Sequence, residues 1–264
     1  MKQLLKTSLA IFLIAFSFTQ VNAQKPKRLE ILFLGHESKH HNSDVLASIM
    51  SKEYFKKGIN ITYTTNINDL NEKTLNAYDA LLLYANYDTI SAKHANALLN
   101  YVKNGNGFIP IHCASYCFRN NPEVVELIGG QFKEHGYDSF PSIFKDYNHP
   151  LIKNITPFYT KDETYTHTLL SKNITVLTER KDGNRKEPYT WIQNVGKGKV
   201  FYTAYGHDEI TFNNTQFLQL VENGILWAVN DNARASLNAF KFATPTYTDA
   251  IIPNYEKRNP APKY

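Results

Sequence analysis

Histidines that closely follow apolar segments are the first sign of chemistry in this sequence. Three apolar runs are each followed by a histidine: residues 29–34 by His36, 107–111 by His112, and 199–204 by His207. In open parallel sheets, ligands bind beyond the carboxyl ends of the strands. Imidazole can act there as a general base, a general acid or a metal ligand. The pattern therefore predicts a histidine-lined site at one edge of a sheet.

His112 has the most informative local context, the segment GFIPIHCAS at 107–115. It reads as a strand-to-helix elbow, which lifts one side chain above the sheet and aims backbone N–H groups at a bound oxygen. A general base or a metal ligand would suit this position. A histidine that is merely hydrogen-bonded to a loop carbonyl is the alternative.

His207 lies in YGHDE, where Asp208 and Glu209 could orient its ring or act as acids. Asp162 and Glu163 precede a short strand that carries Tyr165 and His167. An ordinary solvated turn is the alternative for both segments.

Metal binding is left open by the sequence. The candidate ligands are His36, His41, His112 and His207, and zinc is one possible ion. Adjacent histidines such as His40 and His41 are also often simply solvated. The cofactor is therefore undetermined at this level.

Several enzyme classes lack their motifs. The chain has no G-x-S-x-G, no P-loop, no H-E-x-x-H and no G-x-G-x-x-G after the first apolar run. Its two cysteines, Cys113 and Cys117, are four residues apart, which fits a helical disulfide poorly. Cys113 also stands one residue past the expected elbow, so we do not expect it to be an elbow nucleophile.

The first 23 residues predict a secretory signal. Lys2 and Lys6 precede an apolar run at 9–18, and Val21 and Ala23 supply the small residues of a cleavage site. We expect cleavage after Ala23 and a periplasmic or secreted protein. Without the two signal lysines, 27 basic residues face 24 acidic ones, a net charge of +3. This charge is too small to indicate nucleic acid or an anionic membrane as partner.

The rest of the chain predicts an α/β domain over 24–232. Apolar or β-branched runs at 29–34, 59–65, 79–84, 107–111 and 199–204 indicate strands, and 43–57, a segment from Ser91 to Gly105, and 213–229 indicate helices. Ser43 and Ser91 are the expected helix caps. This alternation is typical of a mostly parallel sheet flanked by helices.

Two segments do not fit that alternation. Residues 120–193 contain short strand-like pieces separated by Gly, Asn and Pro, which we interpret as an irregular antiparallel insertion. Residues 233–264 contain four prolines and little periodicity, which indicates a tail that either wraps the domain or hangs free. After the signal, no apolar segment is long enough to span a membrane. Nothing in the sequence fixes an oligomeric state.

Seven short motifs, in order along 28–231, resemble the ThuA-like, or trehalose-utilisation, family. They are HHNS (40–43), GFIPIHCAS (107–115), LIGGQFKEH (127–135), DYNHPL (146–151), DETY (162–165), GKGKVFYTAYGH (196–207) and ILWAV (225–229). They map onto the family patterns R-H-x-S, G-x-x-x-I-H-x-A, G-G-x-F-x-x-H, D-x-x-H-P, D-E-x-Y, G-x-G-R-V-F-Y-T-x-L-G-H and I-x-W-A. The chain departs from the family at Gly136, where Pro is frequent, and at Pro110.

The resemblance implies a flavodoxin-like fold of the class I glutamine amidotransferase type. The amidotransferase nucleophile, a cysteine, would occupy the position of His112 here, so glutamine hydrolysis is not expected. The family is linked to disaccharide catabolism, including routes through 3-keto sugars. We therefore expect a small carbohydrate as the partner of this chain.

Our main functional hypothesis is an exported hydrolase or lyase acting on disaccharides or 3-keto-glycosides by general acid–base catalysis. We assign catalysis to His112, Glu163 and His207, and substrate binding to His41, His135, Asp162, Tyr165 and Tyr202, with the tyrosines as stacking surface. His112 would be base or metal ligand, and His41 and His135 would be polar anchors or metal ligands. A non-catalytic sugar-binding module and a metal-dependent hydrolase of another small substrate are the alternatives.

Overall fold

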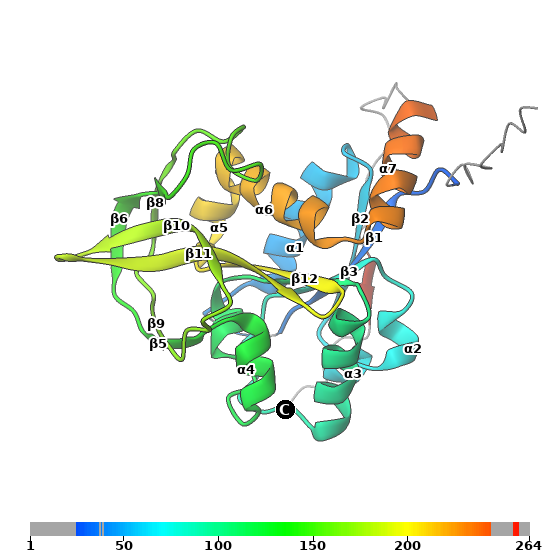
Figure 1. Ribbon diagram of the computed structural model, residues 1–264, viewed down its shortest axis with the longest axis horizontal. Helices are drawn as coiled ribbons and strands as arrows, with labels where there is room; N and C mark the ends of the chain where they lie inside the picture. The colour runs from blue at the N-terminus through cyan, green and yellow to red at the C-terminus, as the bar shows by residue number, and fades with distance from the viewer. Residues whose placement is uncertain (1–24, 37, 39, 244–255, 259–264) are drawn as a thin grey trace, which may run out of the picture.

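A nine-stranded, mostly parallel sheet forms the centre of the protein (Figure 1). The computed structural model describes residues 25–36, 38, 40–243 and 256–258. Across the sheet the strands are β13 (Glu256–Arg258), β2 (Ile59–Thr64), β1 (Leu29–Leu34), β3 (Ala80–Leu83), β4 (Gly107–Pro110), β12 (Gly198–Thr203), β11 (Arg185–Val195), β10 (Thr175–Asp182) and β7 (Ile143–Phe144). Neighbours from β13 to β12 are parallel, whereas β11, β10 and β7 continue the sheet in antiparallel pairing.

Helices cover both faces of this sheet. The α-helices are α1 (Ser43–Phe55), α2 (Glu72–Leu75), α3 (Ala92–Lys103), α4 (Pro122–Ile128), α5 (Glu209–Phe212), α6 (Thr215–Ala228) and α7 (Asp231–Ala243), and the 3-10 helices are η1 (Ile67–Asp69) and η2 (His112–Tyr116). In Figure 1, α1, α6 and α7 lie on one side of the sheet, and α3 and α4 lie on the other. This α/β architecture confirms the fold class predicted from the sequence.

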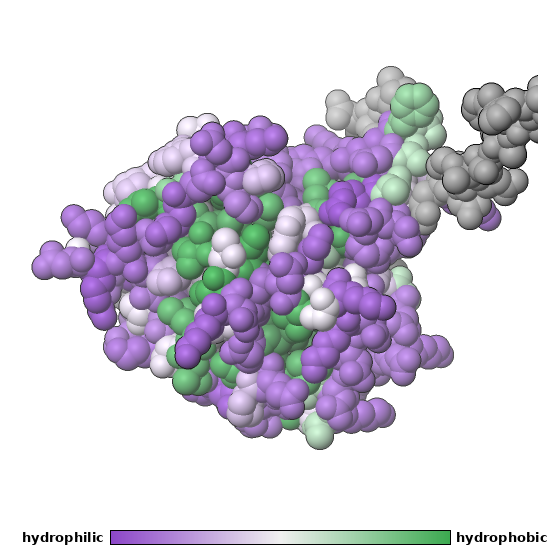
Figure 2. Space-filling model, in the orientation of Figure 1, coloured by the Kyte–Doolittle hydropathy of each residue, from purple (hydrophilic) through white to green (hydrophobic). Residues whose placement is uncertain are grey.

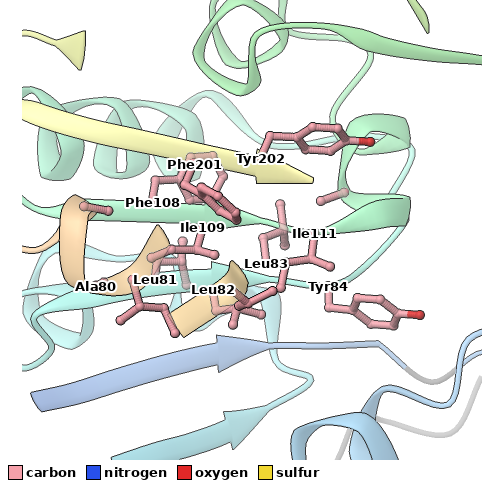
Figure 3. Close-up of a cluster of buried hydrophobic side chains, with 14 of the residues drawn as sticks. Ala80, Leu81, Leu82, Leu83, Tyr84, Phe108, Ile109, Ile111, Phe201 and Tyr202 are labelled. Carbon is pink, nitrogen blue, oxygen red and sulfur yellow. The ribbon is translucent and has the colours of Figure 1, made fainter. Parts of the chain in front are cut away.

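The buried strands match the apolar runs in the sequence. β1 occupies the predicted residues 29–34, and the ends of the other four predicted strands differ from the prediction by one residue at most. Every residue of β3 and β4 is buried, because helices cover both faces. Figure 3 shows their apolar side chains packed against those of β12, with Tyr84 and Tyr202 at one end of the cluster. That end is the carboxyl edge of the parallel strands, where the site lies. Figure 2 shows that the molecular face in view is largely polar around a central apolar strip.

The middle segment, 120–193, contains the expected antiparallel strands and also completes the main sheet. Besides β7, β10 and β11, it forms two small sheets, β5 (Gln131–Glu134) with β9 (Thr166–Thr168), and β6 (Tyr137–Pro141) with β8 (Tyr159–Glu163). Helix α4 was not predicted. Asn121 caps it and Pro122 begins it, which are start signals that the sequence analysis passed over.

The segment expected to be a tail begins as a helix. α7 covers Asp231–Ala243, and its Leu237 is buried, lying so close to Gly58 that a Cβ there would be 2.6 Å from the leucine. Residues 233–243 therefore belong to the packed domain. β13 pairs with β2, while the remaining tail residues and the predicted signal at 1–23 lie outside the described residues. Among the described helices, none combines the length and apolar character needed to cross a bilayer.

Candidate active site

The elbow after β4 places His112 at the carboxyl edge of the sheet. Its φ of +49° is in the left-handed region, which non-glycine residues seldom adopt. Its Nδ1 lies 2.7 Å from the carbonyl oxygen of Ala204, just after β12. A carbonyl only accepts hydrogen bonds, so Nδ1 carries the hydrogen. In the neutral ring the lone pair is then on Nε2, which faces Glu163.

Buried polar side chains support the elbow from behind. The Tyr202 hydroxyl lies 3.1 Å from the His112 carbonyl oxygen and 2.9 Å from Ser115 Oγ. His167 Nε2 lies 3.1 Å from the same hydroxyl, and Glu187 holds the other His167 nitrogen at 3.0 Å. The Tyr202 ring stacks on Trp191 and is fully buried. Tyr202 therefore has no free face for a sugar ring, and it positions the elbow instead.

The loop after β1 brings His41 back to the sheet edge. Ser43 Oγ accepts the backbone N–H of His36 at 3.1 Å and donates to the His36 carbonyl oxygen at 2.6 Å. Ser43 thus closes the loop rather than capping α1, whose N-cap is Asn42. Gly35 permits this closure, since a Cβ would lie 2.6 Å from Ser43 Oγ. His41 ends up with its ring centroid 5.3 Å from the rings of both His112 and His207.

Asp162 fixes the loop that carries His207. Its carboxylate accepts the backbone N–H groups of Gly206 and His207 at 2.8 and 3.1 Å, and the Thr211 hydroxyl at 2.7 Å. Burial raises the pKa of Asp162, although these donors oppose the shift. Because Asp162 is fully buried and engaged with the protein, it holds the site in shape and has no contact to offer a substrate.

Glu163, at the end of β8, lies where the histidines converge. Its Oε2 is 3.2 Å from His112 Nε2, and its Oε1 is 3.2 Å from His207 Nδ1 and 3.6 Å from His135 Nδ1. One ligand atom from each of His41, His112, Glu163 and His207 lies within 4.8 Å of all the others. The segments after β1, β4 and β12 and the last residue of β8 thus bring three imidazoles and one carboxylate close together.

Burial and charge act on these groups in opposite directions. Burial, together with the charges of His112 and His207, lowers the pKa of His41 to about 2. Burial alone would raise the pKa of Glu163, but the hydrogen bond with His112 and the closeness of the His207 ring hold it well below its usual range. Burial opposes protonation of His207, yet the Glu163 carboxylate raises the pKa of that ring. Perturbed groups gathered in this way are typical of functional sites.

A family model described as trehalose utilisation matches residues 30–228. The chain belongs to the ThuA family. It resembles two solved putative ThuA-like proteins. The one from Bacteroides uniformis has 20% identity and a TM-score of 0.67, covering 83% of this chain and 99% of the other. The one from Parabacteroides merdae has 19% identity and a TM-score of 0.68, covering 88% and 95%. No curated protein matches the chain.

Accessibility divides the residues of this ThuA site into an inner and an outer group. The inner rings, His41 and His112, are 6% and 0% exposed, whereas the side chains of Glu163, His207 and His135 are 12%, 20% and 43% exposed. His135 therefore stands at the mouth, and Glu163 connects it to the buried group.

Some of the predicted site residues lie together at the site, whereas others are buried behind it. The structure brings together His41, His112, His135, Glu163 and His207. Tyr165 is buried with its ring stacked on His112 at 4.2 Å, so it packs the elbow instead of offering an open platform. His36 lies one ring further back, 5.9 Å from His41, in a second grouping with Cys113. Both cysteines are free thiols, in agreement with the expected absence of a disulfide.

Tyr137, in β6, is a mouth residue that the sequence analysis missed. The residue is 48% exposed, its ring lies 5.9 Å from the His207 ring, and its hydroxyl donates to Asp208 at 3.2 Å. A single tyrosine in an irregular segment gives no signal by itself. Its pairing opposite Glu163 in the β6–β8 sheet places it at the site.

Proposed function

We propose that this ThuA-family chain is an exported enzyme that cleaves the glycosidic bond of a 3-keto-disaccharide by proton transfer. One observation carries the proposal: the Glu163 carboxylate links an accessible imidazole at the mouth, His135, to a buried group of imidazoles. This arrangement offers a proton acceptor at the mouth of the site and polar groups behind it. A surface that only binds sugar needs neither.

The keto group makes such a reaction feasible. A ketone at C3 acidifies the proton on C2, so a base can remove that proton to form an enolate. The enolate then re-forms the C3 carbonyl and a C1–C2 double bond while the C1–O bond breaks, which expels the second sugar. The leaving oxygen takes up the proton. Addition of water at C1 would complete a net hydrolysis.

The geometry supports His135 as the base. His112 is fully buried, so it cannot touch a substrate without rearrangement of the elbow, and we give it a role behind the reacting atoms. Glu163, 3.6 Å from His135 Nδ1, would stabilise the imidazolium that forms, as a carboxylate orients and stabilises a catalytic histidine elsewhere. His135 would then return the proton to the leaving oxygen. His207 and the inner group would face the developing enolate oxygen.

Two alternatives remain as distinct hypotheses. A sugar-binding module would use aromatic and neutral polar groups, whereas this site gathers five titratable ones. A metal-dependent hydrolase of another substrate is favoured by the close approach of His41, His112, Glu163 and His207. Both give results different from those of the main proposal in the experiment below.

NMR of the protein with 3-keto-trehalose, and separately with trehalose, tests the proposal. We expect turnover of the keto sugar only, because trehalose lacks the acidified C2 proton. His135→Gln should slow turnover by roughly 10²–10⁴-fold, the contribution of a positioned general base. His94→Gln, a change in α3, is the matched control and should react like the wild type.

Three outcomes would contradict it. Broadened sugar signals without product would indicate a binding module. Turnover of both sugars at similar rates would show that the keto group is not used, and inertness towards both would exclude this substrate class.

Export is part of the proposal and rests on the signal pattern at 1–23. Export would put the reaction in the periplasm or outside the cell, where disaccharides are present before they enter the cytoplasm.

A further inference from the structure

We propose that His41, His112, His207 and Glu163 bind a single divalent transition-metal ion of the zinc type. The proposal deepens the proposed function, because it concerns the same site. It stands on the geometry of the ligand atoms, which lie within 4.8 Å of one another and come from four separate segments of the chain.

The tautomer of His112 is the first argument. Its Nδ1–H donates to the Ala204 carbonyl oxygen at 2.7 Å, so the neutral ring turns the Nε2 lone pair toward Glu163 Oε2, 3.2 Å away. Two electron-rich atoms at this distance repel unless a proton or a cation lies between them. A backbone carbonyl behind the opposite ring nitrogen is also the arrangement that orients metal-bound histidines.

The second, independent argument is His41. It is only 6% exposed, and neither of its ring nitrogens has a hydrogen-bond partner among the described residues. Buried polar atoms are nearly always paired, so an unpaired imidazole aimed at two other imidazoles needs an explanation. His207 Nδ1 is close to Glu163 but lacks the alignment of a hydrogen bond. A cation between these atoms would satisfy all of them.

The donor set selects the class of ion. Three imidazole nitrogens and one carboxylate suit zinc and its first-row neighbours, whereas magnesium and calcium prefer oxygen ligands. With metal–ligand distances of about 2.0–2.2 Å, the edges of a tetrahedral site measure about 3.3–3.6 Å. Whichever Glu163 oxygen binds the ion, its 3.2 Å separation from the adjacent imidazole nitrogen is close to that value: His112 Nε2 for Oε2, or His207 Nδ1 for Oε1. The charge of such an ion would lie opposite the enolate oxygen of the proposed reaction.

Metal binding is measured without any sugar. Protein stripped with a chelator is titrated with Co²⁺, followed by visible absorption, and with Zn²⁺, followed by metal content after desalting and by thermal unfolding. We expect one ion per chain and a melting temperature that rises with zinc concentration. His41→Ala and Glu163→Gln should each weaken binding by more than the roughly 10–100-fold loss caused by changes behind a ligand.

Two matched variants sharpen the result. Cys113→Ser should keep the ion, because the second grouping of His36, His41 and Cys113 is not the proposed site. His135→Gln should also bind the ion, although its turnover of the keto sugar should be slowed. Circular dichroism of each variant verifies that it is folded, and the near-isosteric Glu163→Gln serves if His41→Ala does not fold.

The inference would be overturned by a wild type that binds no stoichiometric ion, or by Glu163→Gln binding as tightly as the wild type. Loss of the ion in Cys113→Ser would move the site to the second grouping and would also overturn it. If the stripped protein binds no ion and still converts the keto sugar at the full rate, the metal proposal is refuted and the proposed function is supported. If the protein binds one metal ion per chain but does not convert the keto sugar, the metal site is supported and the proposed substrate is refuted.

Discussion

Glu163 joins two environments that differ in exposure. Toward the interior its Oε2 meets His112, and toward the mouth its Oε1 meets His135, so one carboxylate serves a buried and an accessible imidazole. Its neighbour Asp162 is turned the other way and holds the backbone of the His207 loop. Two adjacent acidic residues therefore have different functions, because successive side chains of β8 point to opposite faces.

At this residue scale, Tyr137→Ala tests substrate recognition. Removing an exposed ring beside His207 should raise KM for the proposed keto-sugar substrate about 3–10-fold, since one aromatic contact contributes ~1 kcal/mol. The melting temperature should stay within about 2 °C. Kinetics and thermal unfolding of Tyr137→Ala are compared with those of Tyr147→Ala, an exposed tyrosine that contacts Phe144 instead. Equal effects of the two substitutions would argue against a recognition role for Tyr137.

At the scale of elements, the turns after β4 and β12 determine the site. His112 has a φ of +49° in the first, and Gly206 has a φ of +119° in the second. Each turn redirects the chain just past the sheet edge and leaves a histidine facing Glu163. Regular strands and helices provide the frame, and these irregular residues aim the reactive groups.

Gly206→Ala tests that dependence. The new Cβ would lie 3.0 Å from the Phe212 ring at an unfavourable φ, so we expect a loss of about 2–3 kcal/mol in the free energy of unfolding. The displaced His207 loop should lower turnover at least tenfold in the folded protein, because small misplacements of reacting groups are costly. Denaturant titration and single-substrate kinetics measure the two effects.

Gly183→Ala is the control for backbone strain alone. Gly183 has a φ of +59° in the β10–β11 hairpin, with open space around its Cβ position. We expect a loss of about 1–2 kcal/mol with unchanged turnover. If Gly206→Ala likewise left turnover unchanged, the loop after β12 would not determine the geometry of the site.

At the scale of the whole molecule, the domain extends past the family match at residue 228. Helix α7 packs beside β1, and Lys27 donates its backbone N–H to the Ser236 carbonyl oxygen at 3.2 Å. The two ends of the described domain are thus held together. This contact lies at the amino-terminal edge of the parallel strands, opposite the site. It should therefore affect the stability of the protein and not its activity.

Leu237→Ala measures the contribution of α7. Deleting a fully buried leucine side chain should cost about 2–5 kcal/mol, because it removes apolar contacts and leaves a cavity. Phe242→Ala, in the same helix but 89% exposed, should change stability by less than about 0.5 kcal/mol. Denaturant unfolding followed by circular dichroism compares the two. Equal stability of both variants would show that α7 does not belong to the cooperative unit.

The sequence by itself determined the frame and most of the candidate residues. Strand and helix periodicity are local properties, so the parallel core, the elbow at His112 and the histidines after strands could all be read from it. The family motifs selected His135 and Glu163 from a segment with little regular pattern.

Only the tertiary structure decided which of these side chains meet and which are buried. His112 and Glu163 are 51 residues apart, and His112 and Ala204 are 92 apart, so their contacts depend on long-range strand pairing that no local pattern encodes. The same pairing buries Tyr165 and Tyr202 and exposes Tyr137, which reverses the expected choice of aromatic surface. It also shows α7 to be part of the domain, because burial of its apolar face needs the partner that folding supplies.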